Sequence, residues 1–278
     1  AGCRLTVLVD SAMQARAVAE ASAQAGIAIP ALIEIDSDGH RSGLVPDDPE
    51  IIEIGRILHQ GGAELAGVLC HAGQSYGAVG HAAQAEFAEV ERAALVRAAE
   101  ALRAAGLPCP IVSAGSTPTA HAAQDLTCVT ELRAGVYVFF DLVMAGIGAC
   151  AVDDIALSVL TTVIGHQPAR GSIMVDAGWM AMSRDRGTAA QEVDQGYGLV
   201  CYEAGRPIPD LIVTQTSQEH GTIALRPGSS AAMPDLPIGT RLRILPNHAC
   251  ATASQHGHYN VIPAKGGPLM QWERFGGW

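Results

Sequence analysis

The sequence predicts an α/β fold, with parallel β/α units over residues 1–150 and a mainly antiparallel β domain over residues 151–278. Three observations support this. Short apolar runs alternate with helical patterns through the first half, and each apolar run ends in polar, reactive or glycine-rich residues. From about Ile155 onward, β-branched runs are separated by Gly/Pro turns without long amphipathic helices.

Element boundaries follow from hydrophobic periodicity and capping signals. Helices are expected over residues 11–26, 48–61 and 81–105, the last with Gly106 as a C-terminal cap. Strands are expected over residues 4–9, 29–36, 63–71, 109–113, 128–132 and 136–140 in the first half, and over 157–164, 172–176, 211–215 and 241–245 in the second. The carboxyl ends of strands carry the active site in β/α barrels, so the polar residues there are the first functional candidates.

The composition favours a globular protein that acts on a small molecule. The 278 residues include 28 acidic and 17 basic side chains, a formal net charge of -11, and no basic cluster, which argues against nucleic-acid binding. No apolar run approaches the roughly 20 residues that a membrane-spanning helix needs. The seven cysteines are spread singly, as in reduced proteins. We therefore expect a cytoplasmic protein with neither a nucleic-acid nor a membrane partner.

A candidate metal site follows the apolar run at 241–245. His248 and Cys250 are separated by one residue, and two such residues share a face if the strand continues through them. Imidazole and thiolate together favour zinc, and the lack of a second donor pair favours an open, catalytic site over a closed structural one. The alternative is that Cys250 packs as a small hydrophobe, as free cysteines usually do.

Three further candidates lie at expected strand ends. Residues 115–119 read Gly-Ser-Thr-Pro-Thr, whose amides and hydroxyls suit a phosphate but which also suits an ordinary turn. Arg133 is either a partner for an anion or cofactor ring, or a solvated charge. His71, followed by Gln74 and Tyr76, is either functional or a satisfied histidine at the end of a core strand.

Taken in order, six motifs resemble one known family. They occupy residues 34–43, 71–76, 112–119, 131–137, 218–221 and 246–250. The chain resembles the metal-activated D-threonine aldolase and D-serine dehydratase family, which includes D-threo-3-hydroxyaspartate dehydratases and belongs with the alanine-racemase-type pyridoxal phosphate enzymes. The resemblance implies a (β/α)8 barrel of alanine-racemase type, with its first units missing from this sequence, before the β domain.

The resemblance also implies cofactors and residue roles. Pyridoxal 5'-phosphate and a divalent metal are implied, zinc first, with manganese or magnesium as alternatives. The implied metal ligands are His248 and Cys250, with Glu219 and His220 nearby. The implied catalytic residues, lining the cofactor ring or the substrate, are Arg41, His71 and Tyr76. The implied cofactor-binding residues are Tyr76, Gly115, Ser116, Thr117, Arg133, Gly135 and Val136, with Arg133 facing the pyridine nitrogen.

One departure from the family pattern concerns the lysine that forms the Schiff base. Family members carry it on the first barrel strand, whereas the sole lysine here, Lys265, lies in a Lys-Gly-Gly-Pro segment that suggests a surface turn. A nucleophilic amine is required to bind the cofactor covalently. We therefore expect that the sequence is part of a longer protein that supplies this lysine.

The resemblance implies a lyase, expected as a homodimer, that acts on D-3-hydroxy amino acids. Cys250 favours a dehydratase, which gives a 2-oxo acid and ammonia, because aldolases of the family more often pair the histidine with aspartate. A D-threonine aldolase-type cleavage to glycine and an aldehyde is the alternative. A catalytically inactive fragment or binding module, without the Schiff-base lysine, and a cofactor-independent metal lyase are further alternatives.

Overall fold

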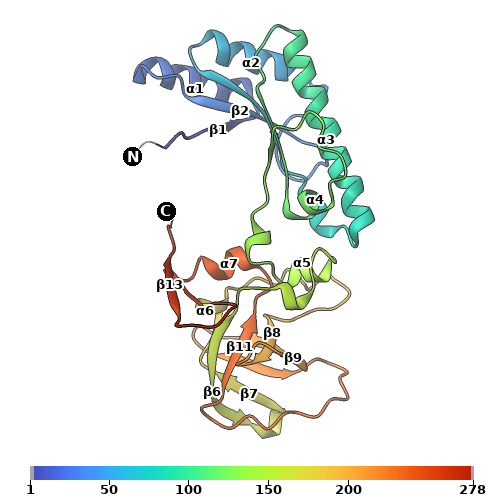
Figure 1. Ribbon diagram of the computed structural model, residues 1–278, viewed down its shortest axis with the longest axis vertical. Coiled ribbons are helices and arrows are strands. Elements are labelled where there is room, and N and C mark those ends of the chain that lie inside the picture. The colour runs from blue at the N-terminus through green and yellow to red at the C-terminus, as the bar shows by residue number, and fades with distance from the viewer. Residues whose placement is uncertain (1–2, 277–278) are drawn as a thin grey trace. The chain divides into compact units, whose positions relative to one another are not determined.

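The computed structural model describes residues 3–276, and these form two compact units. The first unit ends at Gly135 and the second begins at Val136. Figure 1 shows a layered α/β unit in blue and green and a β-rich unit in yellow to red. The two types of unit agree with the fold class expected from the sequence.

The first unit is built on a five-stranded parallel sheet with the strand order β1-β2-β3-β4-β5. The strands are β1 (Val7–Val9), β2 (Pro30–Ile35), β3 (Glu64–Cys70), β4 (Ile111–Ala114) and β5 (Glu131–Leu132). The helices between them are α1 (Ala12–Ala25), α2 (Glu50–Gln60), α3 (His81–Ala104) and α4 (Thr117–Ala122). Each strand pairs in parallel with the next strand in the sequence, so the carboxyl ends of all five strands lie at the same edge of the sheet.

Burial of apolar faces holds these helices on the sheet. Ile33 of β2, Ile54 of α2 and Leu95 and Leu102 of α3 are all fully buried in one cluster. Helix α1 begins where the Ser11 side chain accepts a hydrogen bond from the Gln14 amide, and it ends at a left-handed glycine. The expected helices at 11–26, 48–61 and 81–105 are therefore confirmed to within a few residues.

The second unit contains a closed antiparallel barrel with the strand order β10-β7-β6-β11-β8-β9. Its strands are β6 (Val159–Gln167), β7 (Ser172–Val175), β8 (Leu199–Tyr202), β9 (Pro207–Thr216), β10 (Gly221–Leu225) and β11 (Arg241–Leu245). Short helices α5 (Leu142–Gly146), α6 (Trp179–Met182) and α7 (Ala249–Ala253) and a separate hairpin, β12 (His258–Val261) with β13 (Met270–Glu273), complete it. Val163, Val213, Ile223 and Leu242 fill the barrel core.

The structure differs from the sequence-based expectation at residues 136–140, where we expected a strand. Residues Val136–Val138 form a 3-10 turn, and Phe140 has a positive φ of 50° that a strand does not tolerate. The second unit also begins at Val136, before the expected boundary at 150/151. Residues 136–150 pack with the second unit, because the Leu142 amide donates to Pro246 O at 3.0 Å and the Ala249 amide donates to the Asp141 carboxylate at 2.9 Å.

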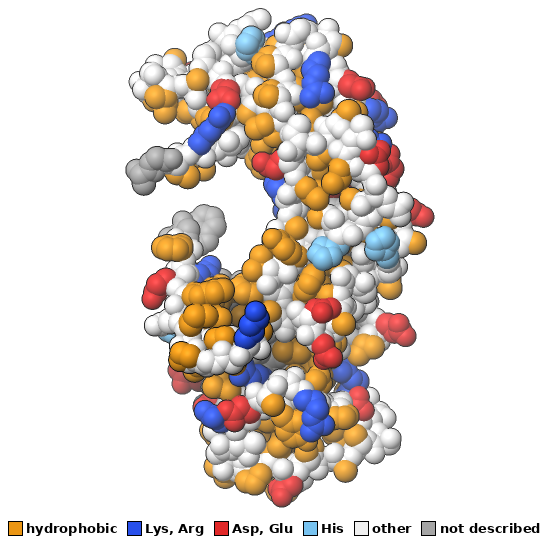
Figure 2. Space-filling model, in the orientation of Figure 1, with side chains coloured by type: hydrophobic (Ala, Val, Ile, Leu, Met, Phe, Trp, Pro, Cys, Tyr) orange, Lys and Arg blue, Asp and Glu red, His pale blue; other side chains and the backbone are white. Residues whose placement is uncertain are grey.

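Hydrophobic side chains gather on the surface of the second unit close to β13 (Figure 2). Leu269, Met270, Trp272 and Phe275 are all exposed there.

Within residues 3–276, none of the helices combines the length and the apolar character that crossing a bilayer requires.

Candidate functional site

The carboxyl ends of β3, β4 and β5 bring together most of the residues predicted to bind the cofactor. We call His71, Tyr76, Gly115, Ser116, Thr117 and Arg133 the strand-end cluster. His71 Nδ1 lies 3.3 Å from Gly115 O, and its ring lies 6.0 Å from that of Tyr76. The hydroxyls of Ser75 and Ser116 are 2.9 Å apart. The loops after β3 and β4 are therefore joined directly.

Arg133 ties the end of β5 to the ends of β3 and β4. Its Nε donates to Ser113 Oγ at 2.9 Å, and Nη2 donates to the carbonyl of Cys70. Its backbone amide donates to Ala114 O at 2.8 Å. The guanidinium is thus held in a fixed position among the strand ends, and a surface charge free in solvent does not describe it.

Glycine is required at position 115 but not at position 135. Gly115 has a φ of +128°, and a Cβ there would lie 2.1 Å from Arg133 O. The close approach of the β4 and β5 loops therefore excludes any side chain. Around Gly135 a Cβ would meet nothing within 4 Å, so open space lies beside it. Val136 follows directly and is the first residue of the second unit.

The amides at the start of α4 are largely used within the cluster. The Ser116 amide donates to Thr119 Oγ1 at 3.1 Å, and the Ser116 hydroxyl is shared with Thr119, which makes a capping box. The Gly115 amide donates to Glu91 at 3.0 Å. The groups at these strand ends that suit an anion are therefore the side-chain hydroxyls and the Arg133 guanidinium.

His71 is held as a neutral base beside two arginines. Because Gly115 O can only accept, Nδ1 carries the proton and Nε2 is the unprotonated nitrogen in the neutral ring. Burial lowers the pKa of His71 from its ordinary value, and the charges of Arg41 and Arg133 add to this effect. Arg41 is itself exposed after β2, with a guanidinium nitrogen 3.9 Å from Glu34. A small cavity of about 180 Å³ lies at the ends of β1 and β2, where Asp10, Glu34 and Ser42 line it.

Glu91 of α3 is a buried carboxylate that the sequence analysis did not single out. Its side chain is 2% exposed, and it accepts hydrogen bonds from the amides of Ala72 and Gly115 and from the Thr119 hydroxyl. Burial raises the pKa of Glu91, while these hydrogen bonds act in the opposite direction. The helix between β3 and β4 thereby reaches both of the loops that carry the strand-end cluster.

The metal-ligand candidates occur together in the second unit, but not on a strand as we expected. Strand β11 ends at Leu245, His248 is the N-cap of α7, and Cys250 is the second residue of that helix. The two side chains are close enough for Cys250 to affect the pKa of His248, and Cys250 is exposed. A turn from extended to helical backbone therefore brings them together, in place of the alternation of a strand.

Asp185, from the loop before β8, orients the histidine. Its Oδ2 lies 3.2 Å from His248 Nδ1, and this contact, with a smaller effect of the Cys250 side chain, raises the pKa of His248 to about 10. The same hydrogen bond lowers the pKa of Asp185. A carboxylate on one ring nitrogen is the usual support for a metal-binding histidine, since it fixes the ring and leaves Nε2 for the metal. Glu219 and His220 are exposed between β9 and β10, and Asp185 is the carboxylate that contacts His248.

Buried polar groups fix the backbone around this pair. Asn247 donates to the carbonyls of Asp185 and Gly196 and accepts from the Thr188 hydroxyl. Asp141 caps α5 and accepts the amide of Ala249, the residue between His248 and Cys250. The loop that carries Asp185 and the turn that carries the pair are thus held in one arrangement.

Both sets of residues fit the groups that the family pattern implies. Hydroxyls, a helix start and a guanidinium suit a phosphate and an aromatic ring, and imidazole with an exposed thiol suits zinc. Within residues 3–276 no cluster of three or more His, Cys, Asp or Glu side chains could hold a metal. A site based on His248 and Cys250 therefore leaves coordination positions open. Lys265, as expected, is exposed in the turn between β12 and β13.

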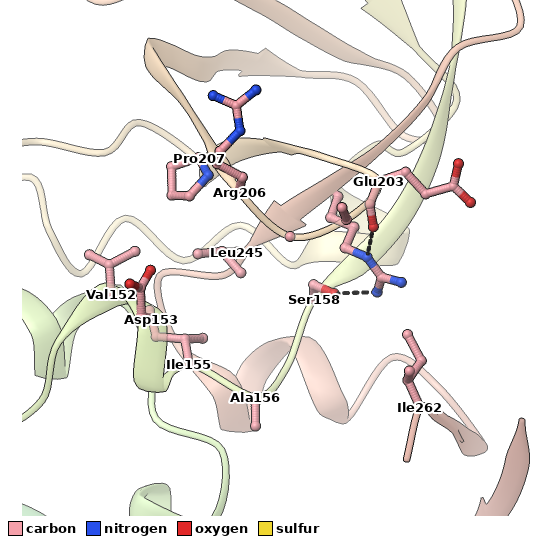
Figure 3. A pocket seen from close by; sticks show the side chains of 13 residues that line it. Val152, Asp153, Ile155, Ala156, Ser158, Glu203, Arg206, Pro207, Leu245 and Ile262 are labelled. Carbon is pink, nitrogen blue, oxygen red and sulfur yellow. Dashed lines mark hydrogen bonds between the residues drawn. The ribbon is translucent and has the colours of Figure 1, made fainter. Parts of the chain in front are cut away.

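A larger cavity, of about 960 Å³, opens in the second unit away from these residues. Arg243 is one of the residues that line it, with Nε donating to Glu203 O at 2.6 Å and Nη1 donating to Ser158 Oγ at 3.1 Å. Figure 3 labels Glu203 and Ser158 and marks hydrogen bonds to both with dashed lines. None of the predicted site residues lines it.

Comparison with known families divides the chain in the same order. Residues 1–143 match the alanine racemase N-terminal domain, and residues 156–262 match the putative serine dehydratase domain. D-threo-3-hydroxyaspartate dehydratase of Delftia sp. (strain HT23) is 57% identical over all of this chain and 73% of its own length. D-serine dehydratase of Dictyostelium discoideum is 29% identical over 83% of this chain and 60% of its own length. D-threonine aldolase of Arthrobacter sp. is 32% identical over 93% of this chain and 64% of its own length.

Solved structures agree with this assignment. The Delftia dehydratase superposes with a TM-score of 0.95 over 100% of this chain and 74% of that one. An alanine-racemase-like protein from Idiomarina loihiensis is 45% identical and superposes with a TM-score of 0.93, over 100% of this chain and 73% of that one. Two variants of a D-threo-3-hydroxyaspartate dehydratase, each 57% identical to this chain, also match. One replaces a cysteine by alanine and is metal-free, and the other replaces the histidine two residues before that cysteine.

The enzymes of the family to which these relatives belong depend on pyridoxal phosphate and a metal. The parallel sheet, the antiparallel barrel and the full-length similarity together show that the chain belongs to the alanine-racemase-type family, in the branch of the D-threo-3-hydroxyaspartate dehydratases.

Proposed function

We propose that the chain carries the cofactor-phosphate and metal sites of a dehydratase that converts a D-3-hydroxy amino acid to a 2-oxo acid and ammonia. D-threo-3-hydroxyaspartate is the first candidate substrate. The observation that carries the proposal is the 57% identity to the Delftia enzyme over the whole of this chain. The His-x-Cys spacing at 248 and 250 adds support, because the replaced histidine and cysteine of the variants have the same spacing.

The strand-end cluster, together with Gly135 and Val136, holds the cofactor in this proposal. Gly115, Ser116, Thr117, Gly135 and Val136 surround the phosphate, and Arg133 faces the ring nitrogen. When bound, pyridoxal phosphate supplies the electron sink that makes the α-proton of an amino acid removable. Arg133 supplies a fixed positive charge, because its hydrogen bonds to Ser113 and Cys70 hold it in place. Such a charge disfavours protonation of a nearby ring nitrogen.

His71, Tyr76 and Arg41 line the cofactor ring or the substrate. His71 presents an unprotonated Nε2, since Nδ1 is committed to Gly115 O and burial lowers its pKa. A nitrogen in this state accepts a hydrogen bond or a proton. The exposed guanidinium of Arg41 suits a substrate carboxylate.

His248 and Cys250 bind the metal in this proposal, with zinc first and manganese or magnesium as alternatives. A divalent metal held by these two residues would supply Lewis acidity toward the 3-hydroxyl that leaves. Asp185 keeps the His248 ring oriented through Nδ1. The pair would supply one nitrogen donor and one sulfur donor, and the Cys250 side chain is exposed.

Retro-aldol cleavage is the second candidate, because D-threonine aldolase of Arthrobacter sp. is 32% identical. Dehydration is the better supported of the two, given the higher identity to a dehydratase over more of the chain. We further infer a homodimer and a cytoplasmic location, to be tested by the mass of the native particle and by fractionation.

A substrate panel tests the proposal. The full-length protein, stripped of cofactor and metal, is given D-serine, D-threonine and D-threo-3-hydroxyaspartate with pyridoxal phosphate alone, with metal alone and with both. We expect ammonia and a 2-oxo acid only with both additions, and fastest from D-threo-3-hydroxyaspartate. Ammonia release without pyridoxal phosphate would instead support a cofactor-independent metal lyase.

A further inference from the structure

We propose that Glu91 is the positioning residue that holds the strand-end cluster in its cofactor-binding form, and that it acts through its hydrogen bonds and not through its charge. This inference rests on the proposed function, since the ligand concerned is pyridoxal phosphate.

The carboxylate of Glu91 joins three separate segments. Oε1 accepts the amide of Ala72 at 3.1 Å and the amide of Gly115 at 3.0 Å, and Oε2 accepts the Thr119 hydroxyl at 2.8 Å. Ala72 follows β3, Gly115 follows β4, and Thr119 lies in α4. One side chain of α3 therefore sets the distance between the loop of His71 and the loop of Ser116.

Glu91 is buried because two backbone amides beside it need a hydrogen-bond acceptor. An ionised carboxylate taken out of water costs free energy unless hydrogen bonds compensate, and an apolar side chain would pack on the sheet without that cost. An apolar residue would, however, leave the amides of Ala72 and Gly115 buried without acceptors. Both amides lie just beyond the ends of their strands, where the sheet no longer supplies a partner.

The two loops that Glu91 holds are those that bear the proposed cofactor contacts. His71 Nδ1 bonds to the carbonyl of Gly115, and Ser75 bonds to the Ser116 hydroxyl. A shift of either loop would therefore move an imidazole and the phosphate-facing hydroxyls together. Displacements of about 1 Å in such sites cost up to about 100-fold in function.

Charge and geometry make opposite predictions for substitutions of Glu91. Glutamine keeps an Oε1 that accepts both amides, while its NH2 group meets Thr119 Oγ1, which can also accept. Aspartate keeps the charge, but it is one methylene shorter and cannot reach all three partners from the same backbone position. A negative charge near a phosphate is repulsive, so the charge itself gives no benefit to binding.

Equilibrium binding separates the two roles. The full-length apoprotein is compared as wild type, Glu91→Gln, Glu91→Asp and Leu95→Ala, by dialysis against pyridoxal phosphate and by thermal unfolding. Leu95 is fully buried one turn further along α3, so Leu95→Ala is the control for loss of helix packing alone. If Glu91→Asp does not fold, Thr119→Val replaces it, because this change removes the hydroxyl that donates to Oε2 and that also accepts the Ser116 amide.

We expect Glu91→Gln to bind like the wild type and Glu91→Asp to bind roughly tenfold more weakly or worse. Leu95→Ala should unfold at a lower temperature with an unchanged dissociation constant. Binding by Glu91→Asp equal to the wild type, or by Glu91→Gln as weak as by Glu91→Asp, would overturn the proposal. A wild type that does not bind pyridoxal phosphate would overturn the proposed function, and the role of Glu91 with it.

Discussion

The Oδ2 atom of Asp185 lies 3.2 Å from Nδ1 of His248, although the two residues are 63 positions apart in the sequence. This contact commits Nδ1 of the ring to a carboxylate, which leaves Nε2 for the metal that we propose. It also joins the loop before β8 to the start of α7, which Asn247 and Asp141 reinforce.

Replacement of Asp185 by asparagine should weaken metal binding by about 10- to 100-fold, because outer carboxylates orient metal-binding histidines and raise their basicity. Metal affinity can be measured by competition with a chromogenic chelator. Glu219→Gln is the matched control, since Glu219 is an exposed carboxylate in a motif of the family pattern. Equal affinity in the Asp185 and Glu219 variants would contradict the role of Asp185.

Replacement of Cys250 by alanine should remove bound metal and turnover while leaving the fold intact. Cys250 is exposed, so little apolar surface is lost, and the unfolding temperature of the metal-free protein should change little. Metal content by elemental analysis and circular dichroism after chelation measure the two effects. Cys201→Ala, at a fully buried thiol in the barrel, should show the reverse pattern. A metal-replete Cys250→Ala protein would exclude the thiol as a ligand.

Gly115 in the strand-end cluster and Gly135, which follows it along the chain, should respond differently to replacement by alanine. Gly115→Ala places a Cβ 2.1 Å from Arg133 O at a positive φ, so we expect a loss of roughly 1–3 kcal/mol of stability. Gly135→Ala meets nothing within 4 Å, so stability should stay within about 0.5 kcal/mol. If Gly135 faces the cofactor phosphate, the Gly135→Ala protein should bind pyridoxal phosphate more weakly while its stability is unchanged. Denaturant unfolding and dialysis measure both, and equal losses of stability would contradict this account of the loops.

The titration of Glu91 should appear in the pH dependence of stability. Burial raises the pKa of Glu91 above its ordinary value of 4.5, so the folded state holds this proton more tightly than the unfolded state. The resulting stabilisation is fully present below pH 4.5 and is lost as the pH rises through the raised pKa. The free energy of unfolding of the wild type should therefore fall relative to Glu91→Gln across that window. Urea unfolding at a series of pH values measures the difference, and a rising difference would contradict it.

The parallel sheet and the barrel could be predicted because their residues carry local patterns. Alternation of apolar runs and helical patterns predicts β1 to β4, and β-branched runs predict β6, β7, β9 and β11. The segment at 136–140 was predicted wrongly, because Val136-Tyr-Val-Phe-Phe has strong strand propensity yet connects two units and turns at Phe140.

The supporting residues of the site could not be predicted in the same way. Glu91 lies in a run of alanine, glutamate and arginine, where it resembles the solvated Glu86 and Glu89, and only packing of α3 on the sheet buries it. Asp185 lies between two arginines in a loop whose path depends on tertiary contacts. His248 and Cys250 could be found because their spacing is local, although the backbone that brings them together is a helix start and not a strand.

The most direct test of dehydration is the fate of D-threo-3-hydroxyaspartate in the full-length holoenzyme. Loss of water followed by hydrolysis of the resulting enamine gives oxaloacetate and ammonia, whereas retro-aldol cleavage gives glycine and glyoxylate. Products can be quantified together by nuclear magnetic resonance and an ammonia assay. We predict ammonia and oxaloacetate in amounts equal to the substrate consumed, with no glycine. Glycine and glyoxylate in place of ammonia would contradict the assignment.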